Sequence, residues 1–290
     1  MTHVLTLVAP PGALTAGLVA RARDAFDAGA PVWLADAEAA DLALPAAPDR
    51  TAIAALLGDA QVDWHLGPAE GRRKKLLVAD MDSTIVTSET LDEIAAFAGL
   101  KDRIAEITRR SMNGEVDFAE ALRLRVGMLK GLGLDALART WAATEMMPGA
   151  AELVATMNAN GAVTALVSGG FTYFTGRVAE RLGFTVHRSN ELLHDGAALT
   201  GKVAEPILDR DAKLATLREL AAAKGWTETD ALAVGDGAND LAMIGAAGLG
   251  VAYRAKPIVA AEARTRVDHA DLRALLFFQG YPAKAFVAGG

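Results

Sequence analysis

The chain has 290 residues and a formal net charge of −7, which argues against a nucleic-acid-binding protein because such proteins normally carry a basic surface. It contains no cysteine, so disulfides, zinc–thiolate sites and thiol nucleophiles are excluded. No segment has the run of about 18 apolar residues that a membrane span requires, and the start MTHVLTLVAPPG lacks the basic residues of a secretion signal. We therefore expect a cytoplasmic α/β protein that acts neither on nucleic acid nor in a membrane.

Residues 1–70 predict a small α+β unit of the βαβ type. The pattern predicts strands over residues 3–8, 31–34 and 61–66, and helices over residues 15–28 and 51–57. The segment ADAEAADLALPAAPDR is rich in alanine, aspartate and proline and is too irregular to assign. GPAEGRRKK, residues 67–75, combines breakers with basic residues that we interpret as solvated. This segment predicts a linker and a domain boundary near residue 70.

From residue 71 to residue 290, short apolar strands alternate with helices, which predicts a Rossmann-like parallel sheet with helices on both faces. The predicted strands are 76–79, 163–167, 231–234 and 250–252, and the helices between them include 150–160, 172–182 and 211–223. Residues 87–145 interrupt this alternation with helical patterns alone, over 88–97, 102–110, 117–129 and 135–143. Because ligands bind beyond the carboxyl ends of such strands, we expect this insert to form a helical cap over the first core strand.

Polar residues follow the predicted core strands at their carboxyl ends. They are Asp80 and Asp82 after the first strand, Ser168, Gly169 and Gly170 after the second, Asp236, Asn239 and Asp240 after the third, and Lys213 early in an intervening helix. Each signal alone occurs by chance, but together and in this order they predict one site. Three carboxylates (Asp80, Asp236 and Asp240) with hydroxyl groups and a lysine suit Mg²⁺, which prefers hard oxygen ligands.

The pair Asp80 and Asp82 suits phosphoryl transfer. The chain has no Walker A loop ending in Gly-Lys-Ser/Thr, so a nucleotide cradle is not indicated. One aspartate can instead act as a nucleophile and form an aspartyl-phosphate, which divides a difficult step in two. The other can protonate the leaving oxygen and later deprotonate the attacking water. Two roles explain two aspartates.

These motifs resemble those of a known family. DMDST, SGGF, the lone Lys213 and GDGAND resemble the four motifs of the haloacid dehalogenase superfamily, and residues 76–280 are most similar to its phosphoserine phosphatases. The resemblance implies Mg²⁺-dependent hydrolysis of O-phospho-L-serine to L-serine and phosphate, the last step of serine biosynthesis. Residues 1–70 weakly resemble the small regulatory ACT domains, which would bind an amino acid, mediate a homodimer or do neither.

The resemblance implies roles for the residues around the expected metal. Asp80 is the nucleophile and a Mg²⁺ ligand, and Asp82 is the acid and base, with its backbone carbonyl also on the metal. Asp236 completes the protein ligands. Asn239 and Asp240 orient the metal-bound water and the lysine, so that Asp240 acts from behind the ligands and Asn239 lies against the substrate.

The remaining expected site residues hold the substrate. Ser168, the Gly169 N–H and Lys213 would bind the phosphoryl oxygens and neutralise charge in the transition state.

In the predicted cap, the resemblance makes Glu89 the acceptor for the substrate ammonium group and Arg125 the donor to its carboxylate, for which a planar guanidinium is well shaped. Phe118 and Arg125 are seven residues apart, hence on one helix face. Phe118 would supply an apolar contact, and Met112 would border the substrate. The alternative for Glu89 and Arg125 is an ordinary solvated helix surface.

Two other functions stay open at this point. The same residues could pass the phosphoryl group to another alcohol, such as homoserine, in place of water. A phosphatase fold could also serve as an amino-acid-binding regulatory module without catalysis. Intact Asp80, Asp82, Lys213 and Asp236 argue against that module, because a retired site is expected to lose at least one of them.

Overall fold

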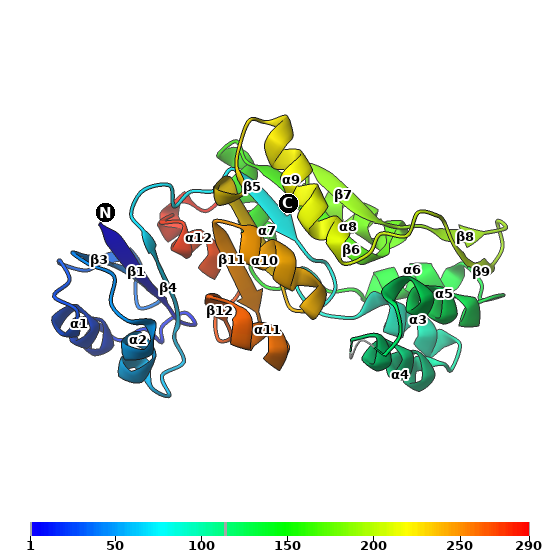
Figure 1. The fold of residues 1–290 in the computed structure, drawn as a ribbon, viewed down its shortest axis with the longest axis horizontal. Coiled ribbons are helices and arrows are strands. Elements are labelled where there is room, and N and C mark those ends of the chain that lie inside the picture. The colour runs from blue at the N-terminus through cyan, green and yellow to red at the C-terminus, as the bar shows by residue number, and fades with distance from the viewer. Residues whose placement is uncertain (1, 113–114, 290) are drawn as a thin grey trace.

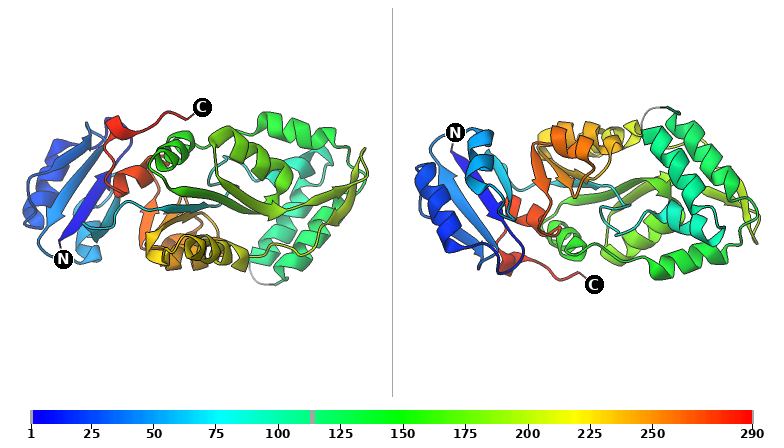
Figure 2. Two further views of the ribbon diagram at one scale, coloured as in Figure 1. Left: turned by 90° about the horizontal axis from the view of Figure 1, so that it is seen from above. Right: turned by 90° about the horizontal axis from the view of Figure 1, so that it is seen from below.

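The structure, a computed structural model, describes residues 2–112 and 115–289, with residues 111 and 112 described by their backbone alone. Three parts follow one another along the long axis of the molecule: an N-terminal unit, a central α/β core and a helical cap (Figure 1). The cap lies at the end of the core away from the N-terminal unit (Figure 2). Among the described helices, none is both long enough and apolar enough to cross a membrane.

The N-terminal unit has the order βαββαβ. Its elements are β1 (His3–Val8), α1 (Ala16–Ala25), β2 (Val32–Ala35), β3 (Ala39–Leu44), α2 (Arg50–Leu57) and β4 (Asp63–Pro68). The strands form an antiparallel sheet in the order β2-β3-β1-β4, which is the split βαβ arrangement of ferredoxin-like domains. The α+β unit is thus confirmed, and the segment that the sequence left unassigned contains the inner strand β3. The resemblance to ACT domains stays a prediction.

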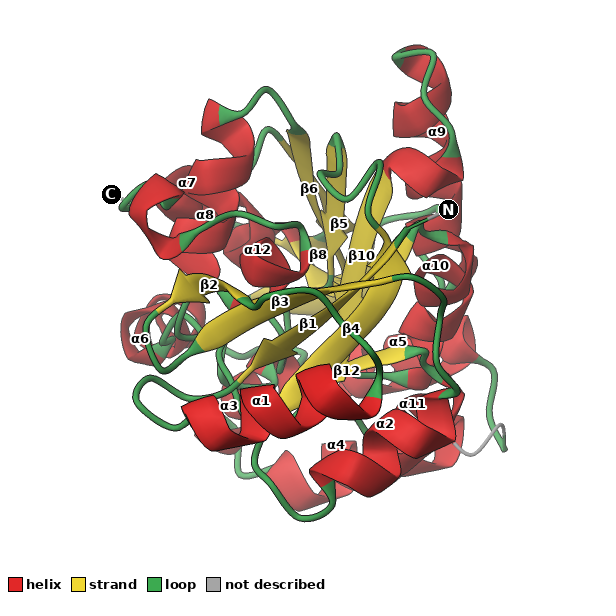
Figure 3. Ribbon diagram, turned by 90° about the vertical axis from the view of Figure 1, so that its left-hand side faces the viewer, coloured by secondary structure: helices red, strands yellow, loops and turns green. Residues whose placement is uncertain are grey.

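Local signals explain where the two N-terminal helices begin. The Thr15 hydroxyl accepts a hydrogen bond from the Leu18 N–H, and the Asp49 carboxylate accepts one from the Thr51 N–H. Both helices pack on one face of the sheet, and the other face is turned toward helix α12 (Ala274–Phe278) of the core (Figure 3). Strand β1 is buried on both faces. Successive side chains of a strand point to opposite faces, and Leu5 is one of those that pack toward α1 and α2.

The core is a parallel sheet, as the sequence predicts. Its strands are β5 (Leu76–Ala79), β6 (Val163–Phe171), β7 (Val186–Asn190), β10 (Ala231–Gly235), β11 (Leu249–Tyr253) and β12 (Thr265–Val267), in the order β12-β11-β10-β5-β6-β7. Helices α7 (Ala150–Ala159), α8 (Thr172–Leu182) and α12 pack on one face, and α9 (Asp211–Ala223), α10 (Leu241–Ala246) and α11 (Pro257–Glu262) on the other. The sequence did not predict β7, β12, α10, α11 or α12.

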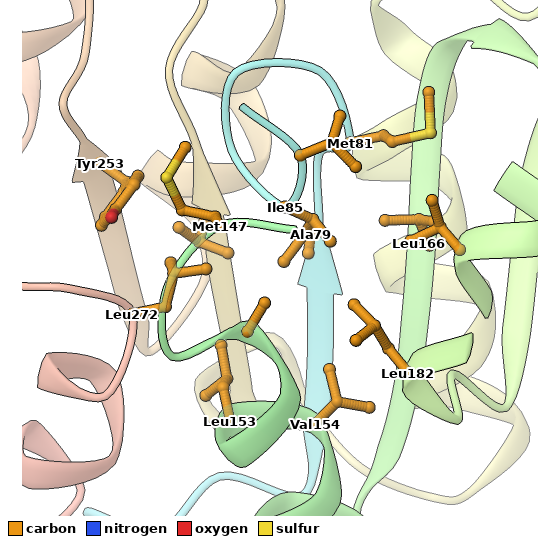
Figure 4. Packing of buried hydrophobic residues seen from close by; sticks show 14 of the residues in the cluster. Ala79, Met81, Ile85, Met147, Leu153, Val154, Leu166, Leu182, Tyr253 and Leu272 are labelled. Carbon is orange, nitrogen blue, oxygen red and sulfur yellow. The ribbon is translucent and has the colours of Figure 1, made fainter. Parts of the chain in front are cut away.

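The apolar strand β5 is buried on both faces. Figure 4 shows Ala79 and Ile85 at the upper end of β5 with Leu166 of β6 to one side, Met81 above them and Val154 of α7 lower along the strand. All five side chains are fully buried. This packing holds the carboxyl end of β5 in a fixed position, and Asp80 is the residue that follows it.

The cap consists of helices that leave the core after β5 and return before α7. They are α3 (Thr90–Phe97), α4 (Lys101–Met112), α5 (Phe118–Met128) and α6 (Asp135–Ala143), in close agreement with the predicted helical insert. The two crossings run side by side, because the Thr87 N–H donates to the Glu145 carbonyl and the Met147 N–H donates to the Ile85 carbonyl. A hairpin of β8 (Leu192–His194) and β9 (Leu199–Val203), which the sequence did not predict, packs against α5.

The sheets of the N-terminal unit and the core are joined. Strand β4 pairs with β12 in an antiparallel contact between Trp64 and Arg266, so that ten strands form one continuous sheet. On β4, the buried Asp63 carboxylate accepts hydrogen bonds from three successive core N–H groups, those of residues 268–270. The two units on either side of residue 70 are therefore held together by backbone pairing and by side-chain hydrogen bonds.

The basic segment before β5 is part of that interface. The guanidinium of Arg72 donates to both carboxylate oxygens of Asp41, at 2.6 and 2.9 Å, and to the Thr6 hydroxyl at 2.9 Å. Its side chain is only 16% exposed. The interpretation of this segment as solvated is therefore wrong for Arg72, because Asp41 on β3 offers it a buried partner that only the tertiary structure brings near.

Candidate active site

The carboxyl ends of β5, β6 and β10 meet beneath the cap in a cleft of about 650 Å³. From the core, the predicted residues Asp80, Asp82, Ser168, Gly169, Asp236 and Asn239 line it. From the cap, the predicted residues Glu89, Phe118 and Arg125 face them. A volume of this size suits a small molecule, and the structure therefore brings the two predicted groups of residues together.

Lys213 lies behind the cleft floor and joins two carboxylates. Its Nζ is 2.8 Å from Oδ1 of Asp80 and 2.6 Å from Oδ1 of Asp240. Burial disfavours the ammonium form, but the carboxylates of Asp240 and Asp80 outweigh burial and raise the pKa of Lys213. The lysine therefore remains a cation beside Asp80.

The acidic cluster can hold a divalent cation. Asp80, Asp236 and Asp240 can each bring one carboxylate oxygen within 4.8 Å of the others, and all three are buried. Asp240 has both oxygens engaged, one by Lys213 and the other by the Gly237 N–H at 3.0 Å. Asp80 and Asp236 each keep one oxygen without a hydrogen bond among the described residues. This hard oxygen donor set fits Mg²⁺, with Asp240 behind the ligands.

Asp82 has an environment that favours its protonated form. Burial, together with the nearby carboxylates of Glu89 and Asp80, raises the pKa of Asp82 to about 8. Its Oδ1 accepts a hydrogen bond of 2.9 Å from the N–H of Thr90, the first residue of α3, and its Oδ2 lies 3.4 Å from the Ser168 hydroxyl. A carboxyl group held in this way can donate a proton at neutral pH.

Glycines after Ser168 keep this corner open. The Ser168 hydroxyl accepts a hydrogen bond of 2.9 Å from the Gly170 N–H. A Cβ at Gly170 would lie 3.0 Å from Oδ2 of Asp82, and a Cβ at Gly169 would lie 3.0 Å from the ring of Phe118. The Ser-Gly-Gly sequence therefore allows a cap phenylalanine and a core aspartate to approach the same backbone.

Glu89 is fixed at the beginning of α3. The Ser83 hydroxyl donates to its Oε1 at 2.9 Å, and Ser83 itself has a left-handed backbone with φ of 57°, which turns the chain sharply after Asp82. Burial raises the pKa of Glu89, and the Lys256 ammonium opposes this shift. The carboxyl group lines the cleft, where it can accept from a ligand's ammonium group.

Arg125 is buried, with 9% of its surface exposed, and this contradicts its interpretation as a solvated surface residue. Its Nε donates to the Ala121 carbonyl at 3.2 Å and its Nη1 donates to the Thr108 hydroxyl at 3.0 Å. These bonds hold the guanidinium on the cleft wall without a carboxylate partner among the described residues. A buried guanidinium of this kind is suited to bind an anionic group of a ligand.

Some site residues escape sequence reasoning. Ser83, Thr90 and Thr108 orient Glu89, Asp82 and Arg125, and a lone hydroxyl residue carries no signal of such a role. Lys256 precedes Pro257 at the start of α11 and lines the cleft. No sequence motif around Lys256 predicts that position. The predicted residue Met112 ends α4, and its side chain lies outside the described residues.

The haloacid dehalogenase-like hydrolase profile matches residues 77–245, which include the cap and every carboxylate of the cleft. The chain belongs to this family. The matched region carries the four expected motifs at the ends of β5, β6 and β10 and on α9, so the fold assignment rests on both sequence and topology.

Among curated relatives, the chain is similar to phosphoserine phosphatases. It is 42% identical to that of Streptococcus thermophilus over 199 residues (69% of this chain, 93% of the relative) and 38% identical to that of Methanocaldococcus jannaschii over 205 residues (71% and 97%). The phosphoserine phosphatase of Archaeoglobus fulgidus is 41% identical over 213 residues (73% and 62%). The chain spans only 62, 57 and 60% of the lengths of the relatives from Archaeoglobus fulgidus, Streptomyces coelicolor and Vibrio cholerae.

Solved structures extend the likeness to the N-terminal unit. A haloacid dehalogenase family hydrolase from Salmonella enterica superposes with a TM-score of 0.85 at 28% identity, covering 96% of this chain and 98% of that one. A probable phosphoserine phosphatase from Vibrio cholerae gives 0.79 at 33% identity, covering 98% and 88%. A substrate-bound phosphoserine phosphatase gives 0.67 at 37% identity, covering 71% and 98%.

Proposed function

We propose that this protein is a Mg²⁺-dependent phosphatase that hydrolyses O-phospho-L-serine to L-serine and phosphate. The observation that carries the proposal is a cleft in which Asp80, paired with Lys213 behind the floor, faces Glu89 and Arg125 of the cap. A phosphoryl group at the floor would place an acceptor for an ammonium group and a donor for a carboxylate around the rest of the ligand. The phosphoserine phosphatase relatives support this choice of substrate.

Two aspartates would carry the chemistry. Asp80 attacks phosphorus and takes the phosphoryl group as an aspartyl-phosphate, while Asp82 gives its proton to the departing serine oxygen. Asp82 then accepts a proton from water, which attacks the aspartyl-phosphate and releases phosphate. A bound Mg²⁺, held by Asp80, Asp236 and the Asp82 carbonyl, would neutralise charge on the phosphoryl oxygens.

The floor and walls of the cleft would hold the phosphoryl oxygens. Ser168, the Gly169 N–H and Lys213 supply a hydroxyl, an amide and an ammonium group, and buried donors of this kind stabilise the charge that develops in the transition state. Asn239, half-buried on the same wall, adds an amide side chain to this set. Asp240 keeps Lys213 in place from behind.

The cap would decide which phosphomonoester reacts. Arg125 offers its guanidinium to the serine carboxylate, and Glu89 accepts from the serine ammonium group. Phe118 lies over Gly169 and covers the reacting bond with an apolar surface that excludes water. We expect such a phosphatase to act in the cytoplasm at the last step of serine biosynthesis, and a homodimer formed through the N-terminal unit remains a prediction.

A substrate panel tests the proposal. Phosphate release would be measured with Mg²⁺ from phosphoserine, phosphothreonine, glycerol 3-phosphate and p-nitrophenyl phosphate. We expect kcat/KM for phosphoserine to exceed that for glycerol 3-phosphate and p-nitrophenyl phosphate by more than about tenfold, because those two lack the ammonium and carboxylate groups and one lost charged contact costs at least that much. A preference for a substrate without ammonium and carboxylate groups would contradict the proposal. Adding homoserine and finding phosphohomoserine would favour the transferase alternative.

A further inference from the structure

Lys256 is a charged residue of the cleft that the proposed reaction does not use. It lies between β11 and α11, where it is the residue before the first turn of α11. Its side chain is 38% exposed, and it lines the cleft together with Asp236 and Glu89. A second lysine at the acidic cluster, besides Lys213, therefore calls for a role of its own.

Lys256 contacts Asp236 through both its main chain and its side chain. Its backbone N–H donates to the Asp236 carbonyl at 3.0 Å, and its Nζ lies 3.4 Å from Oδ2 of Asp236. The first contact ties the start of α11 to the end of β10, and so fixes the distance that the lysine side chain has to span. The second contact leaves Oδ1 as the oxygen of Asp236 without a partner among the described residues.

We propose that Lys256 is a positioning residue that occupies Oδ2 of Asp236 and thereby makes the metal site prefer Mg²⁺ over Ca²⁺. This inference rests on the proposed metal-dependent reaction. Mg²⁺ is small and keeps strict octahedral coordination, so one oxygen from each carboxylate is sufficient. Ca²⁺ takes more oxygen ligands and often both oxygens of one carboxylate, so it loses more when Oδ2 is held by an ammonium group.

The neighbouring carboxylates show the same division of their oxygens. Lys213 holds Oδ1 of Asp80, which leaves Oδ2 of that residue for a cation. Two lysines therefore each cover one oxygen of the two predicted carboxylate ligands. A ligand whose second oxygen is held by a neighbour is also fixed in orientation, which raises the precision of the site.

The Lys256 ammonium also lies near enough to the cap for its charge to lower the pKa of Glu89, which lines the same cleft, and of Asp92. A lysine that served only those groups would affect the binding of the ammonium-bearing substrate and leave the choice of metal unchanged. The ratio of two metal affinities distinguishes these roles, because simple removal of a positive charge strengthens the binding of both divalent cations alike.

The test is isothermal titration calorimetry of the full-length, metal-free protein with MgCl₂ and with CaCl₂, without substrate. The variants are Lys256→Met, which keeps the backbone contact and the chain length, and Lys256→Arg, which keeps a cationic donor. Lys75→Met is the matched control, because Lys75 forms an exposed pair with Asp230 at the opposite end of β5. Thermal unfolding of each metal-free variant checks that it is folded.

We expect Lys256→Met to shift the ratio of the two dissociation constants toward Ca²⁺ by about tenfold, the size typical of residues that orient metal ligands. Lys256→Arg and Lys75→Met should stay within about twofold of the wild-type ratio. Equal tightening of both cations in Lys256→Met, with the ratio of the two dissociation constants unchanged, would overturn the proposal. Wild-type protein that binds no Mg²⁺ would instead overturn the proposed metal dependence itself.

Discussion

Lys213 and Asp240 form a buried ion pair, with 2.6 Å between Nζ and Oδ1 and with side chains that are 3% and 0% exposed. Asp80 shares the same ammonium group at 2.8 Å. Water cannot replace either partner, so the lysine holds the floor of the cleft together as well as serving the proposed reaction. Loss of one partner of such a pair is costly because the other charge remains buried.

Replacing Lys213 with Met should therefore destabilise the fold. We expect the free energy of unfolding to fall by about 3–5 kcal/mol, because two carboxylates would be left without a cation. Urea denaturation measures this change. Lys75→Met removes an exposed pair with Asp230 and should cost less than about 1 kcal/mol. A similarly small effect for both variants would show that water reaches the Lys213 pair.

Asp80→Asn should abolish phosphoserine hydrolysis while the protein stays folded. The amide keeps the size of the carboxylate but loses the nucleophilic oxygen and one charge for the metal. Steady-state phosphate release is the measurement, and Asp59→Asn, on the exposed surface of the N-terminal unit, is the control. Residual turnover above about one per cent of wild type would rule out Asp80 as the nucleophile.

Arg125→Ala should separate substrates by their carboxylate. We expect phosphoserine hydrolysis to fall by about 30-fold to several-thousand-fold, and hydrolysis of p-nitrophenyl phosphate to change little, because one buried charged contact is worth about 2–5 kcal/mol. Arg125→Lys should restore activity only in part, since it loses the planar fork.

Arg123 offers a matched control for Arg125 on the same helix. It is 53% exposed and pairs with Glu205, so Arg123→Ala should change either activity by less than about twofold. Equal losses on both substrates in Arg125→Ala would mean that this residue stabilises the cap and does not recognise the substrate.

Removal of residues 1–70 should lower the stability of the core, although residues 67–75 were predicted to be a linker between independent units. The truncation exposes β12, removes the partner of Arg72 and leaves three N–H groups without the Asp63 carboxylate. In the full chain, Asp63→Ala should lower the free energy of unfolding by about 1–3 kcal/mol, because the Ala270 N–H would be left buried without an acceptor.

The control for the interface is Asp59→Ala, which removes an exposed carboxylate from the N-terminal unit and should have no measurable effect. Calorimetric unfolding compares the wild-type full chain with the truncated chain and with the two variants. A chain of residues 71–290 that is soluble and melts at the temperature of the full chain would show that the two units are independent.

His65 should make stability depend on pH. It lies on β4 against Thr265 and Phe278, where burial and the charges of Arg72 and Arg50 lower its pKa to about 3. Because the folded pKa lies below the usual 6.5, the unfolded chain binds more protons between these values. Stability is therefore present above about pH 6.5 and is lost as pH falls toward 3.

From this residue alone we expect the free energy of unfolding to be about 2 kcal/mol lower at pH 5 than at pH 7. Denaturation of wild type and His65→Gln at both pH values measures the difference. A variant that shows the full wild-type dependence on pH would place its origin in other groups.

Much of the architecture follows from local patterns. Helices α8 and α9 and strand β5 occupy the predicted residues, because their apolar spacing and the polar residues that end them are local signals. Strand β3 shows no such signal, because it is rich in alanine, which has a low propensity for strands. Its strand conformation comes from pairing with β1 on one side and β2 on the other. Helix α12 is apolar at all five positions and has no periodicity to detect.

The carboxylates of the cleft, the lysine behind its floor and the helical cap were predictable from the sequence, because parallel strands bring their carboxyl ends to one edge whatever their exact packing. Three findings came from the folded chain alone: Arg125 is buried, Arg72 joins the two units, and Lys256 covers one oxygen of Asp236. Each of these depends on a partner far away in the chain. The burial of a charged residue and its pairing partner depend on the residues that surround it in the folded protein, and the residue type alone does not predict them.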